Sequence, residues 1–287
     1  MSDELAVLFA KRFVQRRDVK AVQMIVKNKV IYMPDRNMEH PGLYGPVGFK
    51  MQHLQQHLAG QATYGHYMLD ANDEARLFAF DVDLKKTGFY VPMTPFRDGM
   101  VEQEWEAENQ PIALGDPLDP KDNSLREAWL NRAHPSRAFL KTQMGMLARK
   151  LVSSIQENLG IPCAASYSGH KGIHVYGFTG PMPAVQVRAA AHFALEATDD
   201  WELERGQHIY KHRIQDPVMG YPNFNIEVYP KQDSLDDKDL GNLMRLPMGR
   251  NLQAKDPAFF LDLTTPPGVM APHPNPVRLL EAGNPYE

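Results

Sequence analysis

The sequence predicts an α+β fold in which helices and antiparallel strands share a core. Hydrophobic residues make up 43% of the 287 residues, enough for one large domain or for two lobes around a cleft. Segments with apolar residues at helical spacing are interleaved with segments in which apolar and polar residues alternate, which is the pattern of strands. Short turn sequences join several of the expected strands and favour antiparallel pairing.

The N-terminal part of the chain, residues 1–75, is expected to form an α/β lobe. Residues 5–13 predict a helix, and the β-branched residues of 19–32 predict one or two strands. A second helix is expected over 47–58. Residues 63–69 and 76–84 predict two paired strands, joined by a turn of Asp70, Ala71, Asn72 and Asp73.

Residues 76–255 are expected to form a second, larger lobe. It contains an irregular stretch, 87–135, rich in proline and acidic residues, which is either a functional lid or a surface insertion. The other expected elements are helices over 136–158 and 184–198, and strands over 163–167, 174–178, 224–229 and 243–246. Residues 256–287 hold several prolines and are expected to be a C-terminal tail or linker.

Charge and cysteine content exclude several classes of protein. A net charge of -4 excludes a general polyanion binder, so contacts with nucleic acid must be local. The basic residues between Lys11 and Lys29 are one such place, although a solvated face explains them equally well. Cys163 is the only cysteine in the sequence, so no structural zinc is expected. No apolar run approaches the roughly 20 residues of a membrane span, and the N-terminus lacks a secretion signal, so we expect a cytoplasmic protein.

Two aspartates lie on one face of an expected strand. Strand side chains alternate between faces, so Asp81 and Asp83 point together while Phe80 and Val82 point the other way. Like charges this close repel, and a divalent cation such as Mg²⁺ or Mn²⁺ relieves the repulsion. The alternative is a strand end at which both aspartates are simply solvated. Glu227, on the open face of a later strand, could complete a metal site.

A glycine-rich loop between two expected strands has the composition of an anion-binding site. Gly169 and Gly172 free the backbone to bend and to present N–H groups. Ser168 adds a hydroxyl, Lys171 a positive charge and His174 a ring donor, which together suit a triphosphate. A tight hairpin with incidental polar residues is the alternative. Further along, Arg245 and Arg250 are candidate phosphate contacts.

Four motifs occur in a fixed order along the chain. They read Phe-Asp-Val-Asp (80–83), Ser-Gly-His-Lys-Gly-Ile-His-Val-Tyr (168–176), Ile-Glu-Val-Tyr-Pro-Lys-Gln (226–232) and Asn-Leu-Met-Arg-Leu-Pro (242–247). The ordered set resembles the motifs of the archaeo-eukaryotic primase superfamily. The last two motifs are most similar to those of the primase-polymerases of phages, plasmids and mobile conflict systems. The resemblance spans about residues 64–251.

The resemblance implies a primase fold and a set of roles. The larger lobe would be a catalytic lobe resembling an RNA-recognition-motif core, with a mixed or antiparallel sheet. Asp81, Asp83 and Glu227 would bind two Mg²⁺ or Mn²⁺ ions, with Asp233 as the alternative third acid because many relatives carry aspartate at that motif position. The residues implied to bind the nucleotide are Ser168, Gly169, Lys171, His174 and, for the triphosphate or the template, Arg245.

The activity implied is template-directed transfer of nucleotides from (d)NTPs to a nucleic-acid 3′-hydroxyl. The expected partners are a single-stranded DNA template or a primer–template, and a helicase or a further C-terminal domain. The expected setting is a bacterial host or a phage-infected cell. Two rival functions stay open: a metal-dependent nuclease or phosphodiesterase, which paired carboxylates serve equally well, and a non-catalytic single-stranded nucleic-acid-binding module.

Overall fold

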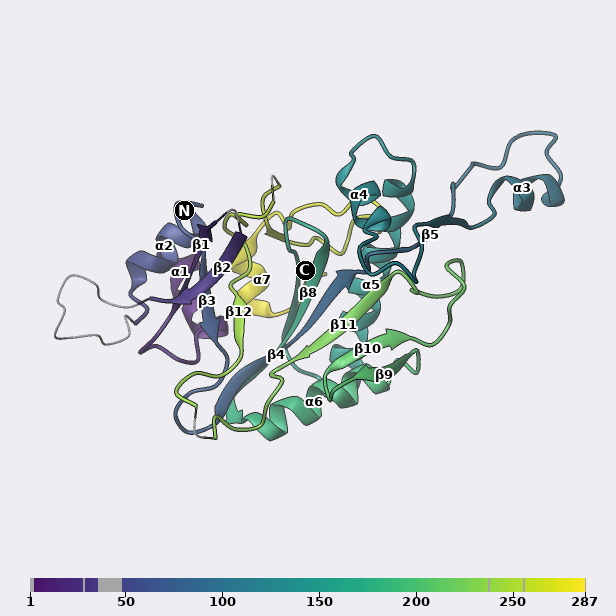
Figure 1. Cartoon of the computed structure of the whole chain (residues 1–287). Coiled ribbons are helices and arrows are strands. Elements are labelled where there is room, and N and C mark those ends of the chain that lie inside the picture. Colours follow the sequence, from purple (N-terminus) through teal and green to yellow (C-terminus); the bar gives the residue numbers. More distant parts are fainter. Residues whose placement is uncertain (1–2, 28, 36–47, 237, 255, 287) are drawn as a thin grey trace.

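Two antiparallel sheets form the centre of the protein (Figure 1). The structure is a computed structural model that describes residues 3–27, 29–35, 48–236, 238–254 and 256–286. The larger sheet has the strand order β13 (Phe259–Phe260), β7 (Cys163–Tyr167), β8 (Gly172–Pro183), β4 (Glu74–Leu84), β11 (Phe224–Tyr229), β10 (Ile209–His212) and β9 (Trp201–Arg205). The smaller sheet has the order β12 (Leu243–Arg245), β3 (Tyr64–Tyr67), β1 (Ala21–Val26) and β2 (Lys29–Pro34).

Two long helices cover one face of the larger sheet. Helices α5 (Ser136–Leu159) and α6 (Ala184–Glu196) pack against its central strands. The residues of β4 that alternate with the aspartates, among them Phe80 and Val82, are fully buried and face this helical layer. The opposite face of β4 is therefore left for Asp81 and Asp83. The expected α+β fold is confirmed.

The N-terminal lobe partly covers the open face of the sheet. It contains α1 (Asp3–Phe13), α2 (Met51–Leu58) and the smaller sheet. Phe13 of α1 packs edge-on against Tyr176 and Phe178 of β8, with ring centroids 5.1 and 5.2 Å apart. The second helix was expected to begin at Val47, a residue that lies outside the described ranges.

Some of the basic residues near the N-terminus are used inside the fold, whereas Lys11, Arg17, Lys27 and Lys29 are exposed. Arg12 Nε donates to the carbonyl oxygen of Leu280 at 2.8 Å. The buried Lys20 ammonium lies 2.6 Å from an Asp35 carboxylate oxygen. This part of the chain therefore offers less free positive charge than its sequence suggests.

The expected pairing of 63–69 with 76–84 is wrong. β3 pairs with β1 and β12, whereas β4 pairs with β8 and β11 in the other sheet. The turn between them does form, because Asp70 Oδ1 accepts hydrogen bonds from the backbone N–H groups of Asn72 and Glu74. The chain thus changes sheets at this turn instead of making a hairpin.

The insertion at 87–135 is folded. It contains the short sheet of β5 (Gly88–Tyr90) and β6 (Ile112–Leu114), and the helices α3 (Glu102–Glu108) and α4 (Ser124–Leu130). Helix α3 lies on an arm that projects from the molecule, whereas α4 returns to pack near α5 (Figure 1).

The C-terminal segment also differs from the expected tail. Strand β13 pairs with β7, and helix α7 (Pro276–Ala282) packs against α1. Leu279 and Leu280 of α7 are fully buried. Residues 256–286, apart from the turns, are therefore built into the core where the structure describes them. None of the helices in the described ranges combines the length and the apolar character that a membrane span requires.

Candidate active site

The strand register brings most of the predicted site residues together. In the pairing of β11 with β4, Glu227 lies opposite Asp81. On the other side of β4, Asp81 lies opposite His174 of β8, and Asp83 lies opposite Gly172. Because paired residues on neighbouring strands share a face, Asp81, Glu227 and His174 point to one side of the sheet. Residues almost 150 positions apart in sequence thus meet across three adjacent strands.

Asp81 lies where negative charge is costly. Its burial, and then the neighbouring carboxylates of Asp83 and Glu227, raise the pKa of Asp81 to about 8. Lys171 and Arg245 oppose this rise. The protein therefore keeps three acids close together against their mutual repulsion, which favours a site for a cation.

Each acid has a cationic or hydrogen-bonding partner of its own. Asp83 forms an ion pair with Lys171. Glu227 lies 2.6 Å from Lys231 Nζ and accepts a hydrogen bond from the Tyr229 hydroxyl at 3.1 Å. Asp81 Oδ1 lies 3.4 Å from His174 Nε2. In the described part of the chain, no three acidic, His or Cys side chains are placed so as to hold a metal ion as they stand.

The chemistry of the acids nonetheless fits a hard divalent cation. Carboxylate oxygens are the ligands that Mg²⁺ and Mn²⁺ prefer, and a bound ion would offset both the burial and the carboxylate repulsion that raise the pKa of Asp81.

The glycine-rich loop joins β7 to β8 beside the acids. Ser168 Oγ accepts hydrogen bonds from the backbone N–H groups of His170 and Gly172, each at 3.3 Å, so its own proton is free to donate. Gly169 has a φ of 78°, and a Cβ there would lie 2.7 Å from the carbonyl oxygen of Asp256. Only glycine suits both the left-handed backbone and this close approach.

His174 is held as a neutral ring. Burial, followed by the charges of Arg245 and Lys171, lowers the pKa of His174 to about 3. Its Nδ1 lies 2.9 Å from the hydroxyl of Tyr176. When that hydroxyl donates to Nδ1, the proton of the neutral ring is on Nε2, which faces Asp81.

Arg245 links the two sheets at the site. It ends β12 in the smaller sheet, is nearly buried, and donates from Nη2 to the carbonyl oxygen of Ser168 at 2.7 Å. Asn251 donates to the same carbonyl at 3.4 Å. The glycine-rich loop is thereby fixed against the N-terminal lobe.

Several residues of the site were not predicted from the sequence. A cavity of about 230 Å³ between the loop, the acids and the smaller sheet is also lined by Gln23 and Tyr32. Gln23 Nε2 donates to the Tyr32 hydroxyl at 2.9 Å. Trp129 of α4 braces the loop from outside, with Nε1 donating to the carbonyl oxygen of His170 at 2.5 Å. No local motif marks these positions, because only the folding of distant segments brings them to the loop.

Two candidates from the sequence lie elsewhere. Asp233 is bound by Arg188 Nη2 at 2.7 Å. Neither Asp233 nor Glu227 is among the described residues that line the loop cavity, but Glu227 lies opposite Asp81 and contributes to its raised pKa. Arg250 lies by a separate cavity next to Gly60 and Pro257. Among the acids, the geometry therefore favours Glu227 over Asp233.

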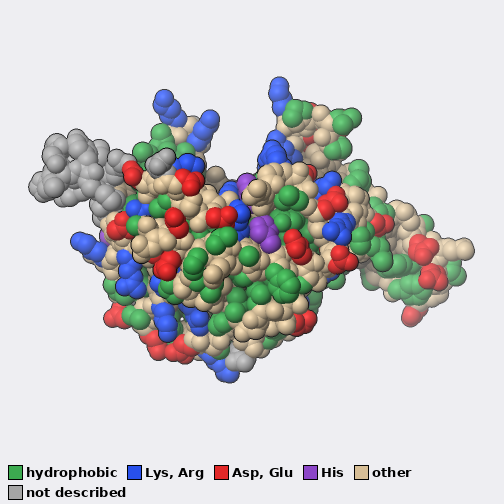
Figure 2. Space-filling view, turned by 90° about the horizontal axis from the view of Figure 1, so that it is seen from below, with side chains coloured by type: hydrophobic (Ala, Val, Ile, Leu, Met, Phe, Trp, Pro, Cys, Tyr) green, Lys and Arg blue, Asp and Glu red, His purple; other side chains and the backbone are tan. Residues whose placement is uncertain are grey.

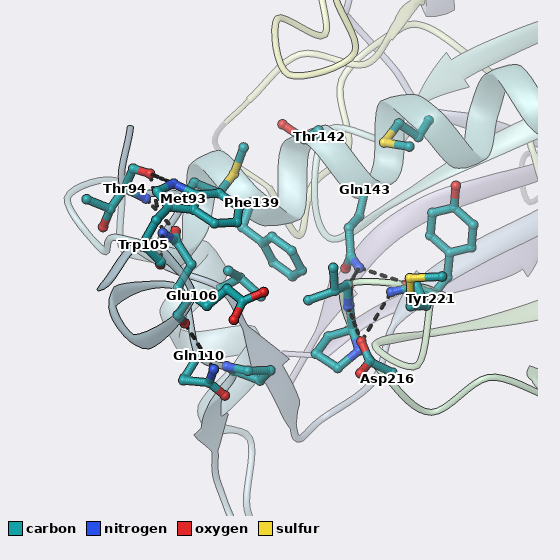
Figure 3. A pocket seen from close by; sticks show the side chains of 18 residues that line it. Met93, Thr94, Trp105, Glu106, Gln110, Phe139, Thr142, Gln143, Asp216 and Tyr221 are labelled. Atoms are coloured by element: carbon teal, nitrogen blue, oxygen red, sulfur yellow. Dashed lines mark hydrogen bonds between the residues drawn. The ribbon is translucent and has the colours of Figure 1, made fainter. Parts of the chain in front are cut away.

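A larger cavity among the described residues is a different site. It has a volume of about 810 Å³ and lies between the α3 arm, α5 and the loop 216–221 (Figure 3). Trp105, Phe139 and Tyr221 line it together with Glu106 and Asp216, and no Lys or Arg lines it among the described residues. Acidic side chains also mark the far end of the arm in Figure 2. This cavity does not suit a polyphosphate.

The comparisons agree with the order of motifs and with the fold. A family model described as the archaeo-eukaryotic primase domain of the TOTE conflict system matches residues 4–270. No curated protein matches the chain. The family match includes both sheets, the glycine-rich loop and all three candidate acids. The chain therefore belongs to the archaeo-eukaryotic primase domain family of the TOTE conflict system and is a primase-like nucleotidyltransferase.

Proposed function

We propose that the protein is a primase-polymerase that adds nucleotides from (d)NTPs to the 3′-hydroxyl of a nucleic-acid strand, directed by a single-stranded DNA template. The observation that carries the proposal is the strand register. It sets Asp81 between Glu227 on β11 and His174 on β8, beside a cavity that also holds Lys171 and Arg245. Acids for metal ions and donors for phosphates thus meet at one point of the sheet.

The glycine-rich loop would bind the triphosphate of the incoming nucleotide. Ser168 has a free hydroxyl proton, and Lys171 supplies a positive charge next to it. His174, as a neutral ring, can donate a hydrogen bond without adding charge. In the free protein Lys171 is paired with Asp83, so a bound triphosphate would compete with that carboxylate for the ammonium. Arg245 holds the loop through the Ser168 carbonyl and adds positive charge to the cavity.

Asp81, Asp83 and Glu227 would hold Mg²⁺ or Mn²⁺. When bound, such ions activate the attacking hydroxyl and neutralise charge on the phosphates. The protein's own task is to position the reacting groups and to supply fixed charges, since phosphoryl transfer needs little covalent help from the enzyme.

The direct test is nucleotide incorporation on a defined template. The purified chain is incubated with a single-stranded template, labelled (d)NTPs and Mg²⁺ or Mn²⁺, with and without an annealed primer, and the products are resolved on a denaturing gel. We expect the unchanged protein to make product. Asp81→Ala and Asp83→Ala should each reduce the rate by at least about a hundredfold while remaining folded.

The two candidate third acids provide a matched pair of variants. Glu227→Ala should lose synthesis, whereas Asp233→Ala should keep it, because Glu227 lies opposite Asp81 on the neighbouring strand and Asp233 is bound by Arg188. Near-normal synthesis by a folded Asp81→Ala protein would disprove the site. Strand degradation without added nucleotides would support a nuclease, and template binding without incorporation would support a non-catalytic binding module.

A further inference from the structure

A second cavity lies on the other side of the acid pair. It has a volume of about 190 Å³ and shares Asp81 and Asp83 with the cavity of the glycine-rich loop. Its other walls come from the end of β4, from α4, from the β9–β10 hairpin and from β11. We call it the Lys85 pocket, after the lysine that directly follows β4. The two cavities therefore meet at the same two carboxylates from opposite sides of β4.

The Lys85 pocket carries unpaired positive charge. Lys85, Arg126 and Arg205 line it, and none of the three forms an ion pair with a carboxylate in the part of the chain that the structure describes. Apart from the three candidate metal ligands, Glu204 is the one acid among the described lining residues. The pocket is thus lined by three cations and four carboxylates. Metal ions held by Asp81, Asp83 and Glu227 would leave the three cations as donors for an anionic ligand.

The surroundings of these cations support the same conclusion. Arg126 uses Nε to bind the carbonyl oxygen of Leu84 at 3.0 Å, which fixes the guanidinium at the pocket. Asn225 also lines the pocket, and its Oδ1 is buried without a hydrogen-bond partner among the described groups; as an acceptor it would take a hydrogen bond from a ligand hydroxyl, not from a phosphate oxygen. At least one buried polar atom of this pocket therefore has no hydrogen-bond partner among the described groups.

The geometry of the reaction identifies the anion. In nucleotidyl transfer the attacking and leaving oxygens lie roughly in line on opposite sides of the α-phosphorus. A triphosphate in the glycine-rich loop places its leaving group on the β8 side of Asp81, so the attacking hydroxyl must arrive from the β11 side. There the 3′ oxygen bonds to the α-phosphorus, the bond to the bridging oxygen breaks, pyrophosphate leaves with those electrons, and the hydroxyl proton passes to solvent.

We propose that the Lys85 pocket binds the phosphate adjacent to the reacting 3′-hydroxyl, with Lys85, Arg126 and Arg205 as its donors. The inference rests on the proposed function and adds to it the site of the strand that is extended. The same phosphate chemistry could come from the last linkage of a primer or from the 5′-triphosphate of an initiating nucleotide. Both would place a sugar hydroxyl at Asp81 and Asp83.

The test separates the two cavities by their ligands. Lys85→Ala/Arg205→Ala should raise the KM for a primer–template by at least about tenfold, and should make its binding less dependent on salt, because phosphate contacts are lost. The KM for the incoming (d)NTP should not change. Lys171→Ala should show the reverse pattern. Lys86→Ala is the matched control, because Lys86 is exposed and its Nζ binds the carbonyl oxygen of Pro120 at 2.6 Å.

A binding measurement keeps the inference independent of catalysis. The affinity of a fluorescent primer–template is measured for the unchanged protein, for the double variant and for Arg126→Lys, which keeps the charge at the Leu84 carbonyl. Equal affinities for the unchanged and double-variant proteins would overturn the pocket assignment, as would a rise in the (d)NTP KM alone. A protein that binds the primer–template as expected but makes no product would contradict the proposed function instead.

The source of the phosphate is resolved by comparing two reactions. Extension of an annealed primer and synthesis without a primer are measured in parallel for the double variant. Loss confined to primer extension would assign the pocket to the primer's last linkage. Loss confined to primer-free synthesis, with a raised KM for the initiating nucleotide, would assign it to that nucleotide's triphosphate.

Discussion

The folded protein disfavours the ionised form of the Asp81 carboxylate, and this lowers the stability of the fold. Its pKa of about 8 arises from burial and from two neighbouring carboxylates, and a side chain of this kind is tolerated where it serves a function. Because the folded state holds this proton to a higher pH than the unfolded state, the folded protein loses stability as the pH rises from about 4 toward 8. The cost is present at neutral pH and would be relieved by a cation bound at the site.

A single substitution should expose this cost. Asp81→Asn removes the titrating group at nearly constant volume, so in metal-free buffer the variant should be more stable than the unchanged protein. The difference in unfolding free energy should grow by on the order of 2 kcal/mol between pH 5.5 and pH 8. Urea denaturation across this range measures it. Added Mn²⁺ should reduce this difference in unfolding free energy at pH 8. If the unfolding free energies of the two proteins changed in parallel with pH, the raised pKa of Asp81 would be contradicted.

The residue scale also shows what local sequence can reveal. The alternation of Phe80, Asp81, Val82 and Asp83 was enough to predict which side chains are buried and which face the site. The Gln23–Tyr32 contact was not predictable, because its two residues lie on strands whose sequences carry no site motif. Their role depends on where the smaller sheet lies, which distant packing decides.

At the scale of the element, α4 connects the insertion to both cavities. Trp129 binds the carbonyl of His170 in the glycine-rich loop, and Arg126 one turn earlier binds the carbonyl of Leu84 at the end of β4. The returning half of the insertion thus supports the site, whereas α3 on the projecting arm does not touch it. The sequence left two alternatives for this segment, a lid or a surface insertion. Neither describes the whole segment, because its two halves behave differently.

Trp129→Phe should weaken nucleotide binding by loosening the loop. The substitution keeps an aromatic ring but removes the N–H that binds His170, a loss of about 0.5–1.5 kcal/mol. The KM for the incoming nucleotide should rise by about three- to tenfold, with a smaller change in kcat. Trp105→Phe is the matched control, because Trp105 makes the same kind of bond, to Thr94 at 2.8 Å, on the distant arm. Equal effects of the two substitutions would contradict a specific role for α4.

Strand existence was easier to predict than strand partners. The expected strands over 224–229 and 243–246 are present, because β-branched and alternating residues mark them locally. The pairing of β3 with β4 was wrong, since adjacency in sequence and a good turn at Asp70 suggest a hairpin. Partner choice depends on contacts with β1 and β12, which lie far away along the chain.

At the scale of the whole molecule, the two ends of the chain close the fold together. Helix α7 packs against α1, and Arg12 of α1 binds the carbonyl of Leu280. The carbonyl oxygen of Gly283, just after α7, accepts the backbone N–H of Cys163 at the start of β7 at 2.8 Å. Prolines suggested a linker here, but the buried Leu279 and Leu280 decide the outcome, because their burial offsets the cost of ordering the segment.

Leu280→Ala should therefore destabilise the whole protein. Removing a fully buried leucine side chain costs about 2–5 kcal/mol, through lost burial and the cavity left behind. Glu281→Ala, at an exposed neighbouring position, should change stability by no more than about 0.5 kcal/mol. Thermal and urea unfolding would measure both. A Leu280→Ala protein as stable as the control would mean that α7 is dispensable for the fold.

The bond between Trp129 and the loop has an optical consequence. Indole emission responds to the polarity and hydrogen bonding of its surroundings, and this buried indole is bound to the peptide group between His170 and Lys171. The chain has three tryptophans, and Trp129 differs from the other two by its bond to the glycine-rich loop. Trp105 binds the carbonyl oxygen of Thr94 on the arm, and Trp201 Nε1 has no hydrogen-bond partner among the described groups. Occupation of the cavity of the glycine-rich loop would thus register as a change in intrinsic fluorescence, without a label and without turnover.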